Sequence, residues 1–346
     1  MVPVEKQKNM LLFLLLGLLT VGLFTASVFT GSVHIPVSEI ARILAGGEPL
    51  RPEWKTIVLD LRLPRALTAL LAGMALSVSG LQMQTVFRNP LAGPFVLGIT
   101  SGASLGVALV VLGYSWIFTA GHSLPGNWVL IAAAWLGSGA VLFVIMLVSV
   151  RVRDIMTILI LGIMFGSAAT ALVSVMQYFS EEAMLKSYII WTMGSLGNVS
   201  RTQMQLFLPA IAAGVTISLM SAKVLNALLL GESYARSLGV NISVTRFTVF
   251  ISTSILAGTV TAFCGPIGFI GIAVPHIARM ITKNANHRVL IPATILTGGV
   301  LMLISDIISR LPGHESNLPI NSVTALIGIP VVIWIIIKNQ KFSKMV

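Results

Sequence analysis

Long apolar runs recur along the whole chain, and they constrain its fold more than any other feature. About ten runs of roughly 16 to 25 residues occur, close to the ~20 residues that an α-helix needs to cross ~30 Å of hydrocarbon. Hydrophobic residues make up 56% of the sequence and charged residues 10%, a balance unlike that of soluble domains. We therefore expect an all-α polytopic membrane protein, with helices at residues 10–29, 63–87, 93–112, 128–150, 155–178, 204–221, 247–263, 266–281, 289–308 and 320–337.

The runs follow one another so closely that a single transmembrane domain, residues 1–346, is expected. Short tails, residues 1–9 and 339–346, would flank a helical bundle at 10–338, and a soluble-like loop at 222–245 interrupts it. The first run follows Lys6 and Lys8 and could be mistaken for a signal peptide. Its length of about 20 residues exceeds the 7–15 apolar residues of such signals, which favours a retained helix.

The distribution of lysine and arginine predicts the orientation of the chain. With ten spans and a cytoplasmic N-terminus, fourteen of the 22 basic residues fall on the cytoplasmic side, so the positive-inside rule favours two cytoplasmic termini. The net charge of +11 then follows from topology. No basic stripe alternates with aromatic residues, so nucleic-acid binding is not expected.

Backbone-breaking residues follow two of the predicted helices. Arg62 and Arg65 open an apolar segment that ends in a Pro/Gly-rich stretch at 88–98. Irregular backbone is tolerated inside a bilayer only where protein or a cavity covers it, so this pattern indicates a path for a polar solute. The sequence Leu-Ala-Gly at 71–73, with Gly80, recurs at 256–258 with Gly265 in the opposite predicted direction. An inverted repeat would pair the stretches 88–98 and 265–275; chance similarity is the alternative.

Residues 231–239, inside the soluble-like loop, have the features of a short exposed helix. Glycines bracket the segment, Glu232 lies where a helix dipole favours an anion, and Gly239 can adopt the left-handed cap. A helix presented to a partner and a plain surface connection both fit these residues.

Several apparent sites are better explained as structure, and we expect no catalytic, metal or cofactor site. Residues 102–106 fit the G-x-S-x-G nucleophile pattern but lie in an apolar helical run, where glycines four apart favour close helix packing. His276 is interpreted as a hydrogen-bonded histidine and Cys264 as a small packing residue. No phosphate-binding G-x-x-x-x-G-K-[ST] sequence occurs, so any ATP must be hydrolysed by another chain.

Six short motifs follow one another along the chain in a fixed order. They are Leu-Arg-Leu-Pro-Arg at 61–65, Arg-Asn-Pro-Leu-Ala at 88–92, Gly-Glu-Ser at 231–233, Gly-Pro-Ile-Gly-Phe-Ile-Gly at 265–271, Pro-His-Ile-Ala-Arg at 275–279 and His-Arg at 287–288. Their order resembles that of the FecCD-type permeases, the membrane subunits of ABC importers for ferric siderophores, haem and cobalamin. The resemblance covers residues 10–338, with two departures: Asn286, where the family usually has Asp, and Asn321, where it usually has Gly.

The resemblance implies a function and a set of partners. Two copies of the permease would form the pathway in a bacterial inner membrane, two ABC ATPase subunits would dock from the cytoplasm, and a periplasmic or lipoprotein binding protein would dock from outside. The cargo would be a metal chelate, with ferric siderophore ranked first, cobalamin second and haem third by how common each is in the family.

The resemblance also implies roles for particular residues, and simpler readings stand beside them. The simpler reading for Arg310 is a local i, i+4 ion pair with Asp306. For Arg62 and Arg65 it is anchoring of the helix at the membrane–water interface, and for Asn89-Pro90 it is the end of a helix. The implied roles are binding-protein docking for Arg62, Arg65 and Arg310, ATPase coupling for Gly231, Glu232, Ser233, Ala235, Leu238 and Gly239, and the inner gate for Asn89, Pro90, Leu91 and Thr157.

Two other functional classes, a secondary transporter and an intramembrane hydrolase, fit the sequence less well. An ion-coupled secondary transporter would place Asp or Glu inside its helices, whereas here the acidic residues fall at ends and loops, with Asp306 the deepest. An intramembrane hydrolase would need a nucleophile with a base, or a metal motif, and neither is evident.

Overall fold

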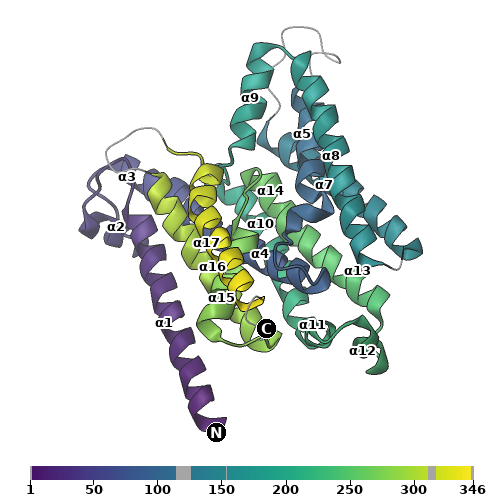
Figure 1. Cartoon of the computed structure of the whole chain (residues 1–346). Helices are drawn as coiled ribbons and strands as arrows, with labels where there is room; N and C mark the ends of the chain where they lie inside the picture. The colour runs from purple at the N-terminus through teal and green to yellow at the C-terminus, as the bar shows by residue number, and fades with distance from the viewer. Residues whose placement is uncertain (1, 114–125, 153, 311–316, 344–346) are drawn as a thin grey trace.

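The computed structural model describes residues 2–113, 126–152, 154–310 and 317–343, which form helices joined by short turns and no strand (Figure 1). Seven helical stretches in this part of the chain are long and apolar enough to cross a membrane, and three shorter apolar helices complete the ten predicted spans. The main helices are α1 (Val2–Phe29), α4 (Leu63–Val86), α5 (Ile99–Val111), α7 (Asn127–Arg151), α8 (Ile155–Tyr178), α10 (Arg201–Met220), α13 (Ile242–Thr253), α14 (Thr259–Cys264), α15 (Ile270–Thr282), α16 (His287–Ser309) and α17 (Ile320–Ser343).

The second span begins earlier than the sequence predicts. α3 (Pro52–Thr56) and the π-helix η1 (Ile57–Arg62) run directly into α4, so a single 35-residue helical stretch covers 52–86. Pro64 has no N–H to donate to the preceding turn, and the wider π-turn ahead of it accommodates this loss without ending the helix. The predicted start at residue 63 was therefore too late, because the more polar stretch before it, which includes Asp60 and Arg62, is also helical.

α4 is the central helix of the bundle, and it lies against α10, α13, α15 and α16. Most of it is buried, and glycines allow its closest contacts. A Cβ added to Gly73 would lie 2.2 Å from the carbonyl oxygen of Gly298 on α16, and one on Gly80 would lie 1.7 Å from that of Gly271 on α15. Small residues at helix contacts let the backbones approach closely. Such packing matters in a membrane because the hydrophobic effect does not drive helices together there.

α5 and α7 form a second tightly packed pair, which confirms the structural reading of residues 102–106. A Cβ on Gly102 would lie 2.6 Å from the carbonyl oxygen of Gly137, and one on Gly106 would lie 2.1 Å from that of Ala133. Ser104 lies inside α5 and not on the strand-to-helix turn that the nucleophile pattern requires.

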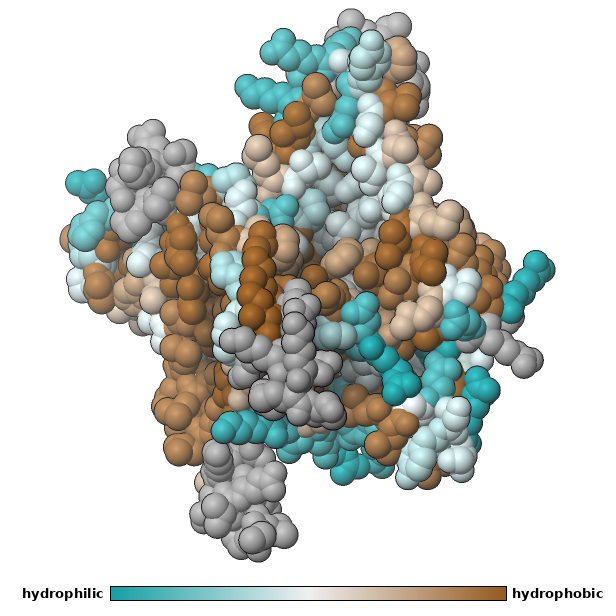
Figure 2. All heavy atoms as spheres, viewed as in Figure 1, coloured by the Kyte–Doolittle hydropathy of each residue, from teal (hydrophilic) through white to brown (hydrophobic). Residues whose placement is uncertain are grey.

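The two ends of the bundle are polar, and apolar side chains cover the surface between them (Figure 2). The lower end in Figure 1 carries the N-terminus of α1 together with α11 (Ala222–Leu229) and α12 (Glu232–Ser237). The upper end carries α2 (Val37–Leu44), α3 and α9 (Glu182–Thr192). An apolar belt between polar ends is the surface that a lipid bilayer requires.

Candidate functional site

The three predicted docking arginines lie together at the upper end. Arg62 closes η1, Arg65 lies in the first turn of α4, and Arg310 follows the last residue of α16. All three line one hollow of about 340 Å³, together with residues 31–33, Ser195, Gly197, Asn198 and Asn317. Residues far apart in the sequence therefore meet around one basic, open site.

Asp306 joins two of these arginines. Its carboxylate is fully buried, with one oxygen accepting a hydrogen bond from Nε of Arg65 at 2.7 Å and the other accepting from Arg310. Ser27 of α1 donates to the same carboxylate at 3.1 Å. The Asp306–Arg310 ion pair that the sequence offered is present, and the Arg65 and Ser27 bonds extend it into a link between α1, α4 and α16.

Arg62 is held differently, by backbone oxygens alone. It is 5% exposed, and its guanidinium donates to the carbonyls of Val28, Phe29 and Val33. A Cβ on Gly31 would lie 2.7 Å from Nη2 of Arg62, so this glycine makes room for the guanidinium. Arg62 and Arg310 are thus built into the wall of the hollow, whereas the Arg65 side chain remains 17% exposed.

The hollow carries an excess of positive charge. The guanidinium groups of Arg65 and Arg310 pair with the single carboxylate of Asp306, and Arg62 lines the same hollow without a carboxylate partner among the described residues. Since guanidinium pairs well with carboxylate groups and stays charged at working pH, this arrangement suits an anionic partner. The sequence reading missed that Asp306 bonds to Arg65, and it missed Ser27, Ser195 and Asn198. The sequence signal for these contacts was Asp306 itself, a lone acidic residue near the end of an otherwise apolar span. Because a buried charge needs partners, it indicated that polar side chains from other helices would surround it.

The two broken segments meet inside the bundle. Gly98 and Gly265 have φ of +67° and +74°, and Phe269 has φ of +65°, so the helical path is interrupted at each. A cavity of about 350 Å³ is lined from both sides, by Leu76, Pro94, Phe95, Thr100, Pro266, Ile267, Gly268, Phe269, Gly271, Ile272 and Asn321. A further cavity of about 240 Å³ is lined by Arg65, which also lines the basic hollow, and by Gly265, which begins the second broken segment. This cavity therefore lies between the basic hollow and the broken segments.

Three of the four predicted gate residues, Asn89, Pro90 and Leu91, form a turn at the lower end of α4, and the fourth, Thr157, lies in the first turn of α8. The side chain of Asn89 accepts from the Leu91 N–H at 2.9 Å, and Leu91 is 40% exposed. His276 donates from Nε2 to the Pro90 carbonyl at 2.8 Å, which confirms its reading as a hydrogen-bonded histidine. Thr157 bonds to Asp154 through its N–H and its hydroxyl, and these bonds hold the pKa of the Asp154 carboxyl below its usual value.

α12 forms the predicted short helix between glycines. Gly231 has φ of +108° and Gly239 has φ of +80°, so the left-handed conformation expected at Gly239 is present. Glu232 pairs with Arg246 of α13 and, at 4.0 Å, with Arg236, which fixes α12 against its neighbour. Of the remaining predicted residues here, Ala235 is buried beneath the helix, Ser233 and Leu238 are exposed, and Tyr234 is exposed beside them.

A bundle of apolar helices with interrupted segments inside it and polar ends has the architecture of a membrane transport protein. The FecCD transport family model matches residues 18–338, and the chain belongs to that family. It is 36% identical over 299 residues to the vitamin B12 import system permease proteins BtuC of Salmonella typhi and Salmonella typhimurium, which covers 86% of this chain and 89% of each relative. An inward-facing structure of a metal-chelate type ABC transporter superposes with a TM-score of 0.81 and 30% identity, covering 94% of this chain and 99% of that one.

Proposed function

We propose that this chain is the membrane-spanning permease subunit of a binding-protein-dependent ABC importer that carries a metal chelate into a bacterial cytoplasm. The observation that carries the proposal is the cavity between the two broken segments, with a basic hollow on one side and α12 on the other. Residues 1–346 act as one membrane domain in the inner membrane, two copies enclose the pathway, and separate ATPase subunits hydrolyse ATP.

In this proposal the basic hollow receives acidic side chains of the binding protein. Arg65 makes the contact because it is the most exposed of the three arginines, while Arg62 and Arg310 supply positive charge from the wall. Arg65→Gln should weaken docking of the purified binding protein to the reconstituted importer about tenfold, and should flatten its salt dependence. Arg51→Gln removes an exposed upper-end cation outside the hollow and serves as the control; equal effects of both would contradict the assignment.

α12 couples ATP hydrolysis to transport in this proposal. Exposed Tyr234 and Leu238 would enter a groove of the ATPase, and the Glu232–Arg246 ion pair would pass the movement to α13. Glu232→Arg should abolish uptake while ATP hydrolysis continues, and the reversed pair Glu232→Arg with Arg246→Glu should restore part of the uptake. Glu182→Arg, on α9 at the upper end, is the matched control. Normal uptake by Glu232→Arg would refute the coupling role.

We assign the inner gate to Asn89, Pro90, Leu91 and Thr157. The exposed Leu91 side chain stands on a turn fixed by Asn89 and by the His276 bond to Pro90, so it can close a passage without moving the backbone. Leu91→Ala should raise leakage of cargo from loaded vesicles in the absence of ATP, whereas Leu229→Ala, an exposed position on α11, should not.

We propose cobalamin as the cargo ahead of ferric siderophore, because the relatives above are vitamin B12 permeases. Cells lacking the chain should be offered labelled cobalamin, ferric siderophores and haem in parallel. Loss of cobalamin uptake that the wild-type chain restores supports the proposal. Loss of siderophore uptake alone would instead identify ferric siderophore, which the sequence analysis ranks first, as the cargo. Uptake that stops with a proton uncoupler while ATP is maintained would favour the ion-coupled secondary transporter instead.

A further inference from the structure

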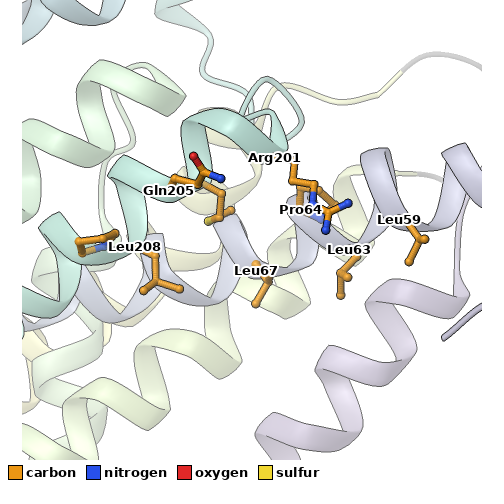
Figure 3. Close-up of a pocket in the computed structure, with 9 residues that line it drawn as sticks. Leu59, Leu63, Pro64, Leu67, Arg201, Gln205 and Leu208 are labelled. Carbon is orange, nitrogen blue, oxygen red and sulfur yellow. The ribbon is translucent and has the colours of Figure 1, made fainter. Parts of the chain in front are cut away.

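An apolar groove outside the proposed pathway lies between the starts of α4 and α10. Its volume is about 510 Å³. On one side Leu59, Leu63 and Leu67 follow a single face of η1 and α4, and on the other Arg201, Gln205 and Leu208 follow a single face of α10 (Figure 3). Pro64, Met204 and Pro209 complete the lining.

Backbone irregularities on both sides coincide with the groove. Pro64 follows the π-helix η1, and Pro209 lies inside α10, where it cannot donate the usual hydrogen bond to the carbonyl of Gln205. π-turns and internal prolines bend helices. Because the π-helix lies on one side of the groove and Pro209 on the other, we attribute the separation of the two helices here to these backbone irregularities.

The groove combines an apolar floor with a cation at one end. Arg201 is its only charged lining residue and is exposed, and it forms none of the ion pairs found among the described residues. Among the residues that the structure describes, no acidic side chain lines the groove to neutralise this charge. Both helices are candidate membrane spans, and Arg201 is the first residue of its span, so the cation lies at the membrane surface while the leucines lie deeper.

We infer that this groove binds an anionic phospholipid. Its phosphate would pair with Arg201 and bond to Gln205, and an acyl chain would lie along Leu63, Leu67 and Leu208. Arginine suits this role because guanidinium forms charge-assisted, bidentate bonds with phosphate oxygens. A water-soluble protein is a poor occupant for a groove walled by two membrane spans, and a zwitterionic lipid would leave the Arg201 charge only partly balanced.

The test measures lipid binding by the full-length chain reconstituted in mixed phosphatidylglycerol–phosphatidylcholine vesicles. Spin-labelled phosphatidylglycerol should be retained about fivefold more strongly than spin-labelled phosphatidylcholine, since one basic residue near the surface contributes about 1 kcal/mol with anionic lipid. Arg201→Gln should remove this preference, whereas Lys186→Gln, an exposed upper-end cation on α9, should keep it.

A second pair of variants tests the groove itself. Leu208→Trp should fill the groove and lower retention of phosphatidylglycerol, whereas Leu206→Trp, on the same helix but outside the lining, should not; the two leucines are 44% and 41% exposed. Equal retention of the two lipids by the wild-type chain would overturn the inference, as would a preference that survives Arg201→Gln. Loss of a dimer in Leu208→Trp, with lipid retention unchanged, would assign the groove to a second copy of the chain.

Discussion

Asp306 carries its charge in a fully buried position, and its partners make that charge tolerable. Two guanidinium groups and the Ser27 hydroxyl surround the carboxylate, so its desolvation is offset by charge-assisted bonds. Removing one partner of such a pair is costly, because the remaining charges stay buried without compensation. Asp306 therefore matters to stability as well as to the shape of the basic hollow.

We predict that Asp306→Ala destabilises the protein by about 3 kcal/mol, because Arg310 would lose its buried counter-ion. Thermal unfolding in detergent micelles, followed by tryptophan fluorescence, measures the change. Glu48→Ala breaks the exposed Glu48–Lys55 pair and should cost less than about 1 kcal/mol. Similar losses in the two variants would show that the Asp306 cluster does not contribute as a buried network.

At the scale of elements, the bundle depends on helices that approach through glycine. Contacts of α4 with α15 and α16 bring backbone against backbone at Gly80 and Gly73, with no room for a methyl group. Glycine in a helix interior costs about 1 kcal/mol relative to alanine, so its use here reflects the packing gained. Gly102 and Gly106 serve the same purpose where α5 packs against α7, whereas Gly17 and Gly22 of α1 have open space around them.

Gly80→Ala should therefore be destabilising by at least about 2 kcal/mol, because the added Cβ would lie 1.7 Å from the Gly271 carbonyl oxygen and the helices would have to separate. Gly22→Ala, in α1 with open space around it, should be neutral or slightly stabilising. The fraction of each variant that remains monodisperse after heating gives the comparison. A tolerated Gly80→Ala would mean that α15 can shift without loss of stability.

The length of the apolar runs predicted the spans well, because hydrophobic thickness fixes how long a span must be. The run length missed the start of the second span, where the π-helix η1 carries the helix back beyond Leu63. The two departures from the family pattern also make tertiary contacts: Asn321 accepts from the Gly268 N–H at 3.0 Å, and Asn286, which caps α16 locally, also accepts from the Asn226 side chain. Such long-range partners leave no trace in local sequence.

The same limit applied to the candidate sites. Motif order singled out Arg62, Arg65 and Arg310, and the structure brings all three to one hollow. Their unequal exposure depends on Asp306 and on backbone carbonyls of residues 28–33, which only the folded chain brings near. α12 was easier to predict, since its glycines and first-turn glutamate are local features.

At the scale of the whole molecule, the polar ends must face different compartments, and the excess of basic residues favours the end with the termini and α12 as cytoplasmic. The lone cysteine, Cys264, is buried, so the wild-type chain should resist a membrane-impermeant maleimide and provide a clean background. In intact spheroplasts, Lys55→Cys at the upper end should be labelled, whereas Ser233→Cys on α12 should be labelled only after permeabilisation; both positions are exposed. The opposite pattern would invert the orientation and, with it, the proposed roles of the basic hollow and of α12.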